Sequence, residues 1–88
     1  MNDAWRLVFD EDAFQFVLTR RLRERLVLLK ALASVKADPY QEGDFEVADR
    51  SGRTLSVRRA RPFLITYWLD ASVKEVRVIN IELVTMVS

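Results

Sequence analysis

Hydrophobic residues change their spacing twice along the chain, and each change marks a boundary between predicted elements. Residues 5–9 form a short apolar and aromatic run that is typical of a strand. Residues 13–37 contain neither glycine nor proline, and leucines recur there at steps of three and four, which predicts amphipathic helix. From residue 44 onward, apolar and polar residues alternate, and this spacing is typical of strands. The pattern therefore predicts a strand, a helical region and then a sheet.

The helical region is expected to contain a short helix over about 11–18 and a longer one over about 20–36, with one kinked helix as the alternative. The acidic residues 10–12 favour a helix N-terminus, because carboxylates cap free N–H groups and complement the helix dipole. Thr19 is expected to separate the helices, since threonine is a good N-cap. Pro39 ends the second helix, because the residue before a proline avoids the α region.

The second half of the chain predicts a meander of strands. Residues 44–59 indicate a hairpin around the turn 49–52, and the nearly all-apolar run 62–69 indicates a central strand buried on both faces. The β-branched, alternating run 75–83 predicts a last strand. The element order is then β-α-α-β-β-β-β. This order predicts a single α+β domain over residues 1–88, with two N-terminal helices packed on a mostly antiparallel sheet of four or five strands.

Composition narrows the chemistry that this chain can perform. The 88 residues include no cysteine and no histidine, which excludes disulfides, thiolate nucleophiles, Cys- or His-ligated metals and Ser-His catalysis. We expect no cofactor and no metal, and any catalysis would use Lys, Arg, Tyr, Asp, Glu, Ser or Thr. The early acidic residues are unlike a secretory signal and no apolar run is long enough to span a membrane, so a cytoplasmic protein with no membrane partner is expected.

Charge is balanced overall but arranged in blocks. The net charge is +1, from 14 Lys and Arg against 13 Asp and Glu. Residues 19–36 carry +5, residues 37–49 carry −5 and residues 50–61 carry +5. The two basic blocks could form one positive face for an acidic or phosphate-bearing partner, unless the acidic block between them neutralises them.

The second half also resembles a known protein family. The segments DPYQEGDFEVADRSGR (38–53), LSVRRARPFLITYWLD (55–70) and KEVRVINIE (74–82) resemble the link from helix to sheet, the arginine-rich strand with its following aromatic strand, and the last strand of the RelE/ParE superfamily. Members of this superfamily are the toxins of bacterial type II toxin–antitoxin modules. The resemblance implies a RelE-like fold and a toxin-like protein that binds an antitoxin and a translation or DNA-gyrase target.

The two branches of this superfamily imply different activities. RelE proteins are ribosome-dependent mRNA endonucleases whose Lys, Arg and Tyr side chains act on the RNA, whereas ParE proteins act on DNA gyrase without a nuclease site. By position, Arg58 matches a catalytic basic residue of RelE proteins. The next expected basic position falls on Phe63 or Leu64, and residues 82–88 contain no basic residue, tyrosine or histidine. The alternatives are therefore a RelE-type ribonuclease contacting RNA or the ribosome, a ParE-type inhibitor, and a non-toxic orphan interaction domain.

The candidate binding residues are arginines from both basic blocks: Arg20, Arg21, Arg53, Arg58, Arg59 and Arg61. Strand alternation predicts that Arg58 and Arg59 point to opposite faces of the sheet. The helical arginines could instead form a solvated face. The hairpin arginines could instead pair with acidic residues such as Glu46 and Asp49 across the hairpin.

Three further features have both a functional and a structural interpretation. The acidic residues Glu42, Asp44 and Glu46 would share one face of a strand, where a solvated edge is favoured over a divalent metal site. The aromatic side chains could stack on bases, but in so small a protein most of them must be core. The apolar tail 83–87 could continue the last strand, fold over the core, or meet an antitoxin or a second copy in a homodimer.

Overall fold

The computed structural model describes residues 4–41 and 43–84 and has the predicted order of elements. The first half contains β1 (Arg6–Phe9), α1 (Glu11–Leu18) and α2 (Leu22–Ala37). The second half contains β2 (Phe45–Ala48), β3 (Thr54–Ala60), β4 (Phe63–Asp70) and β5 (Glu75–Leu83). The prediction of an α+β fold is confirmed.

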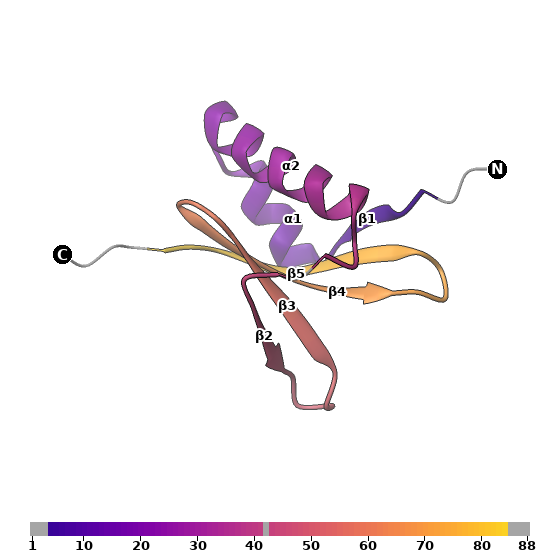
Figure 1. The fold of residues 1–88 in the computed structure, drawn as a ribbon. Coiled ribbons are helices and arrows are strands. Elements are labelled where there is room, and N and C mark those ends of the chain that lie inside the picture. The colour runs from indigo at the N-terminus through magenta and orange to yellow at the C-terminus, as the bar shows by residue number, and fades with distance from the viewer. Residues whose placement is uncertain (1–3, 42, 85–88) are drawn as a thin grey trace.

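The five strands form one sheet in the order β1-β5-β4-β3-β2 (Figure 1). Strands β2 to β5 follow one another as antiparallel neighbours, as expected for a meander. Strand β1 pairs with β5 in parallel, because the two helices carry the chain over the sheet before the meander begins. This leaves β4 at the centre of the sheet and leaves β1 and β2 as its edges.

Both helices lie on the same side of the sheet, while the β2–β3 hairpin extends away from them (Figure 1). The core lies between the helices and the sheet. The buried side chains of this core are Ala13, Val17, Leu28, Leu32, Val35, Phe63, Ile65, Tyr67, Val76, Val78 and Ile81. Because strand residues alternate between faces, Leu64, Thr66 and Trp68 of β4 point to the other side, which we call the helix-free face.

The central strand differs from its prediction on this helix-free face. Burial along β4 alternates between complete and partial, so only the face toward the helices is fully buried. The prediction of a strand buried on both faces is therefore wrong. Within the described residues no helix covers the second face. The β4 side chains there, Leu64, Thr66 and Trp68, are half-buried, whereas Leu55 and Val57 of the neighbouring β3 are buried on the same face.

The connection between the helices also differs in one detail. Thr19 is the C-cap of α1, where its hydroxyl donates to the Phe16 carbonyl at 2.9 Å. The N-cap of α2 is Arg21, whose backbone N–H donates to Glu24 Oε1 at 3.4 Å. The prediction that Thr19 caps the second helix is wrong, because its hydroxyl satisfies the end of the preceding helix. Asp10 is the N-cap of α1 as expected, but its carboxylate makes no capping hydrogen bond.

The predicted turn between β2 and β3 is built on one carboxylate. Asp49 Oδ1 accepts hydrogen bonds from the Ser51 hydroxyl at 2.6 Å and from the N–H groups of Ser51 and Arg53 at 2.9 Å each. These bonds, with that from the Ser51 hydroxyl foremost, lower the pKa of Asp49. Gly52 has a φ of 84°, a left-handed conformation that favours glycine. The turn residues therefore fix the register of the hairpin.

Neither helix in residues 4–41 and 43–84 has the length and apolar character needed to cross a membrane.

Candidate functional site

The arginine-rich strand β3 presents its two adjacent arginines to opposite faces of the sheet, as alternation predicts. Arg58 pairs with Ile65 of β4 and lies toward the helices, whereas Arg59 pairs with Leu64 and lies on the helix-free face. The two side chains therefore cannot contribute to one site. The candidate arginines divide into separate groups.

Arg58 is held against α2 on the helix side. Its Nη2 donates to the Ser34 hydroxyl at 3.2 Å, and Gln41 Nε2 donates to the Ser34 carbonyl at 3.3 Å. The side chain of Arg58 is half-buried, beside the ring of Tyr67. This position serves to attach β3 to the helix layer, and the assignment of Arg58 as a catalytic residue stays a prediction.

Tyr67 is buried under α2 and contributes to the core rather than to a surface site. Its hydroxyl has no hydrogen-bond partner within the described residues. Burial raises the pKa of Tyr67 above its usual value of 10.0, while the nearby Arg58 guanidinium and Ser56 hydroxyl act in the opposite direction. A tyrosine in this setting holds its proton and is not placed to act as a base on an exposed substrate.

The raised pKa of Tyr67 predicts a loss of stability at alkaline pH. The folded state holds the phenol proton more tightly than the unfolded state, so the stabilisation is complete below pH 10.0 and is lost as pH rises through the pKa of the folded protein. We expect Tyr67→Phe to remove this alkaline decline. Because the hydroxyl has no hydrogen-bond partner among the described residues, the substitution should change the free energy of unfolding at pH 7 by less than about 1 kcal/mol.

Urea unfolding at pH 7 and at about pH 10.5 measures both effects, since the higher value lies above the usual tyrosine pKa of about 10. The matched control is Tyr40→Phe, because Tyr40 is exposed and packs its ring against Trp5 at a centroid distance of 5.5 Å. A Tyr67→Phe protein that loses stability at high pH as steeply as the original would contradict the assignment.

Arg59 and Arg61 line a groove of about 460 Å³ on the helix-free face. We call it the Arg59/Arg61 groove. Its other lining residues come from β2, from the β3–β4 turn, from the start of β4 and from the segment after β5: Phe45, Pro62, Phe63, Leu64 and Val84. The groove therefore combines two cationic groups with an apolar surface.

Local backbone contacts hold this groove together. The Asp44 carboxylate accepts a hydrogen bond from the Arg59 N–H at 2.6 Å, which ties the start of β2 to β3. The Val84 N–H donates to the Pro62 carbonyl at 2.8 Å, which ties the end of β5 to the β3–β4 turn. The Arg61–Pro62 peptide bond in this turn is cis. These contacts place Phe45 of β2, Leu64 of β4 and Val84, which follows β5, around the two arginines.

Among the described residues, the expected pairing of hairpin arginines with nearby acidic residues occurs at one position. Arg53 Nη1 lies 3.9 Å from Asp49 Oδ2. The guanidinium groups of Arg59 and Arg61 form no ion pair with any residue in 4–41 or 43–84, and Asp44 engages the backbone of Arg59 rather than its side chain. Within the described part of the chain, these two cations of the basic hairpin therefore have no carboxylate partner.

The remaining arginine candidates lie outside the groove. Arg53 stacks over the Trp68 ring at 4.1 Å, and Arg77 approaches the same ring at 5.9 Å. Arg20 stacks over Phe16 at 4.5 Å, and Arg21 is exposed at the start of α2. The structure therefore brings together Arg59 and Arg61 but none of the other four.

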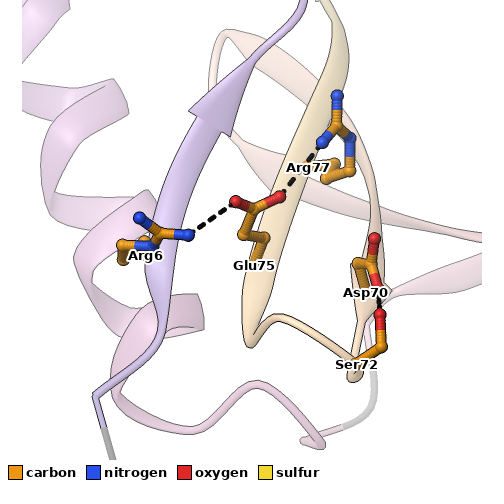
Figure 2. A network of polar contacts seen from close by, with 5 residues as sticks. All are labelled: Arg6, Asp70, Ser72, Glu75 and Arg77. Carbon is orange, nitrogen blue, oxygen red and sulfur yellow. Dashed lines mark hydrogen bonds and ion pairs between the residues drawn. The ribbon is translucent and has the colours of Figure 1, made fainter.

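A separate polar network lies on the helix-free face, at the end of the sheet away from the Arg59/Arg61 groove. Glu75 bridges two arginines, with its Oε2 at 2.8 Å from Arg6 Nη2 and its Oε1 at 3.0 Å from Arg77 Nη1 (Figure 2). Beside it, the Ser72 hydroxyl donates to Asp70 Oδ1 at 2.6 Å. Each of these cations already has a carboxylate partner, so this network joins β1 to β5 and is not a second open site.

Two sequence predictions fall partly outside the described residues. Glu42 lies outside them, so the acidic trio is reduced to Asp44 and Glu46, and in the described part of the chain no three carboxylates gather as a metal site would require. Residues 85–87 of the apolar tail also lie outside the described residues. The last strand does continue to Leu83, and Val84 lines the groove.

No protein-family model and no curated protein sequence matches this chain. Solved structures do share its fold. The archaeal RelE–RelB complex from Pyrococcus horikoshii OT3 superposes with a TM-score of 0.73 at 8% identity, over 91% of this chain and 94% of that chain. The isolated Escherichia coli RelE toxin gives 0.70 at 20% identity, over 96% and 88%. The chain therefore has the fold of RelE toxins.

The intact Escherichia coli RelBE toxin–antitoxin complex also shares this fold, with a TM-score of 0.63 at 21% identity, over 94% of this chain and all of that chain. The expected RelE-like fold is thus confirmed from archaeal and bacterial structures, at identities that are informative about fold alone.

Proposed function

We propose that this chain is the toxin-like component of a type II toxin–antitoxin module and that it acts by binding through the Arg59/Arg61 groove. The observation that carries the proposal is the pair of guanidinium groups, without carboxylate partners in the described residues, in an apolar groove on a RelE-like fold. Guanidinium groups bind carboxylates and phosphates in two-pronged geometry, so the groove suits an acidic or phosphate-bearing partner.

An antitoxin is the proposed natural partner. Two of the similar structures are complexes of RelE with RelB, which supports an antitoxin for this chain as well. An antitoxin segment with acidic and apolar side chains would cover the groove, its carboxylates on Arg59 and Arg61 and its apolar groups on Phe45 and Leu64. The module would act in the cytoplasm, on a target in translation or on DNA gyrase, and the antitoxin would compete with that target.

Chemistry at the groove favours binding over cleavage. RNA hydrolysis through the ribose 2′-hydroxyl needs a group that can accept a proton. Arginine side chains remain charged and cannot serve as that base. Within residues 4–41 and 43–84, the groove has no lysine, tyrosine or carboxylate in its lining, and Tyr67 is buried on the other face. A RelE-type ribonuclease therefore remains the alternative prediction and is not the function that we propose.

The test is controlled expression of the chain in a bacterial host, alone and together with the product of any small adjacent reading frame. We expect expression to arrest growth, and the adjacent product to bind the chain and restore growth. Normal growth, combined with an adjacent product that does not bind, would exclude the proposal and leave the orphan interaction domain. Growth arrest with mRNA cut on translating ribosomes would instead favour the ribonuclease.

A further inference from the structure

The second helix has an apolar stripe on the side that faces away from the core. Leu22, Leu26 and Leu29 are 69%, 58% and 46% exposed, and Ala33 continues the line. Their spacing of four, three and four residues places them on one side of an α-helix, as in the seam of a coiled coil. The buried residues of α2 occupy the opposite side. We call this set of four residues the α2 stripe.

The α2 stripe leads into a hollow at the C-terminal end of the helix. This hollow has a volume of about 430 Å³, and its lining includes Trp5, Ala33, Lys36 and Ala37. The ring of Tyr40 packs edge-on against Trp5 at a centroid distance of 5.5 Å. Apolar surface therefore runs along α2 from Leu22 to Trp5, which precedes β1, and Tyr40, which follows α2. This is more than the scattered exposed leucines of an ordinary helix.

Basic residues flank the α2 stripe on both sides. At 100° per residue, Arg23 and Lys30 lie along one flank, while Arg25 and Lys36 lie along the other. Arg25 is half-buried, and its Nε donates to the Arg20 carbonyl at 2.9 Å. Glu24, the acidic residue of this helix, is half-buried and accepts the Arg21 N–H. The exposed half of α2 is therefore apolar along its centre and positive at both margins.

We propose that the α2 stripe binds an amphipathic helix of a partner protein whose apolar seam is flanked by Asp or Glu. Leucines at this spacing would pack against a complementary seam, as in helical recognition by i, i+3, i+4 and i+7 anchors. Acidic residues at the margins of the partner would face Arg23 and Lys30 on one side and Arg25 and Lys36 on the other. The charges would select the partner and fix its orientation.

Charge argues against a second copy of this chain as the occupant. Two copies packed through the α2 stripe would bring two segments of +5 charge into contact, with basic margins against basic margins. Like charges in such a position are repulsive. The inference goes beyond the function proposed above, because it concerns the opposite side of the molecule and requires neither toxicity nor the Arg59/Arg61 groove.

The test uses a synthetic helical peptide as the probe. Its leucines follow the same four-and-three spacing and glutamates flank its seam, and a matched peptide carries lysine in place of glutamate. Fluorescence anisotropy with the purified chain is expected to show binding of the glutamate peptide, weakened by salt, and at least tenfold weaker binding of the lysine peptide. Equal binding of the two peptides, or no binding of the glutamate peptide, would overturn the proposal.

Two variants locate the binding on α2. Leu26→Glu is expected to weaken binding of the glutamate peptide at least tenfold, whereas Val73→Glu, at an exposed apolar residue in the β4–β5 turn, leaves it unchanged. Because Leu26 is exposed, circular dichroism should show both variants folded.

A charge reversal provides the sharpest outcome. The double variant Arg23→Glu/Lys30→Glu is expected to lose the preference for the glutamate peptide, because one margin of the α2 stripe becomes acidic while the other stays basic. An unchanged preference would overturn the role of these charges. A doubled mass in sedimentation that Leu26→Glu abolishes would identify a second copy as the occupant and would also overturn the proposal.

Discussion

Phe63→Ala is expected to lower the free energy of unfolding by about 3–5 kcal/mol, enough to leave much of so small a protein unfolded at 37 °C. Phe63 is 1% exposed at the start of the central strand, and its ring packs edge-on against Phe16 of α1 at 5.8 Å. Its removal opens a cavity between the sheet and the helix, and the backbone of β4, paired on both sides, cannot move to fill that space. Urea unfolding followed by circular dichroism measures the loss.

The same substitution at Phe45 provides the control. Phe45 lies on the edge strand β2 and is 41% exposed. Phe45→Ala should therefore cost less than about 1 kcal/mol. If both substitutions lowered the free energy of unfolding equally, Phe63 would not be a core residue as the structure describes it.

Reversing both charges of the groove is expected to abolish its function. We expect Arg59→Glu/Arg61→Glu to weaken antitoxin binding by about 100-fold or more and to remove growth arrest, because two charge-assisted hydrogen bonds are lost and replaced by repulsion. Both side chains are exposed, so the variant should remain folded. Growth curves and titration with the product of the adjacent reading frame measure the effect.

A matched double variant, Arg21→Glu/Arg50→Glu, changes the net charge by the same amount at exposed positions outside the groove. We expect it to bind and inhibit growth like the original chain. If both double variants lost function alike, overall charge rather than the groove would be responsible.

Sequence patterns identified the elements well because local signals agreed with the final fold. The helix at residues 11–18 and the strand at 75–83 have the predicted bounds, since the acidic start, the leucine spacing and the β-branched alternation each specify one conformation. The burial of β4 was predicted less well. Its side chains are apolar on both faces, and whether a second layer covers them depends on how the rest of the chain packs.

The Arg59/Arg61 groove was only partly visible in the sequence. Alternation predicted that Arg58 and Arg59 separate, but family position favoured Arg58. The groove depends on Leu64 lying opposite Arg59 and on the Val84 N–H bonding to the Pro62 carbonyl, and the second contact joins two segments that are far apart in the sequence. The sequence did contain a signal for the groove. Arg59 and Arg61 are two residues apart beside the turn, and this spacing places two side chains on the same face of a strand.

The stacking of Arg53 and Arg77 around Trp68 gives the protein an optical reporter of its own. Arg53 lies in the β2–β3 turn, directly before β3, and Arg77 lies on β5, so the indole of Trp68 has a cation beside it from each side. Indole emission responds to nearby charge and to water. Opening of the β2–β3 hairpin would withdraw Arg53 and shift that emission while the helices, measured by circular dichroism, stayed intact. In a Trp5→Phe variant, in which Trp68 is the remaining indole, the order in which the hairpin and the helices unfold can therefore be followed without attaching a dye.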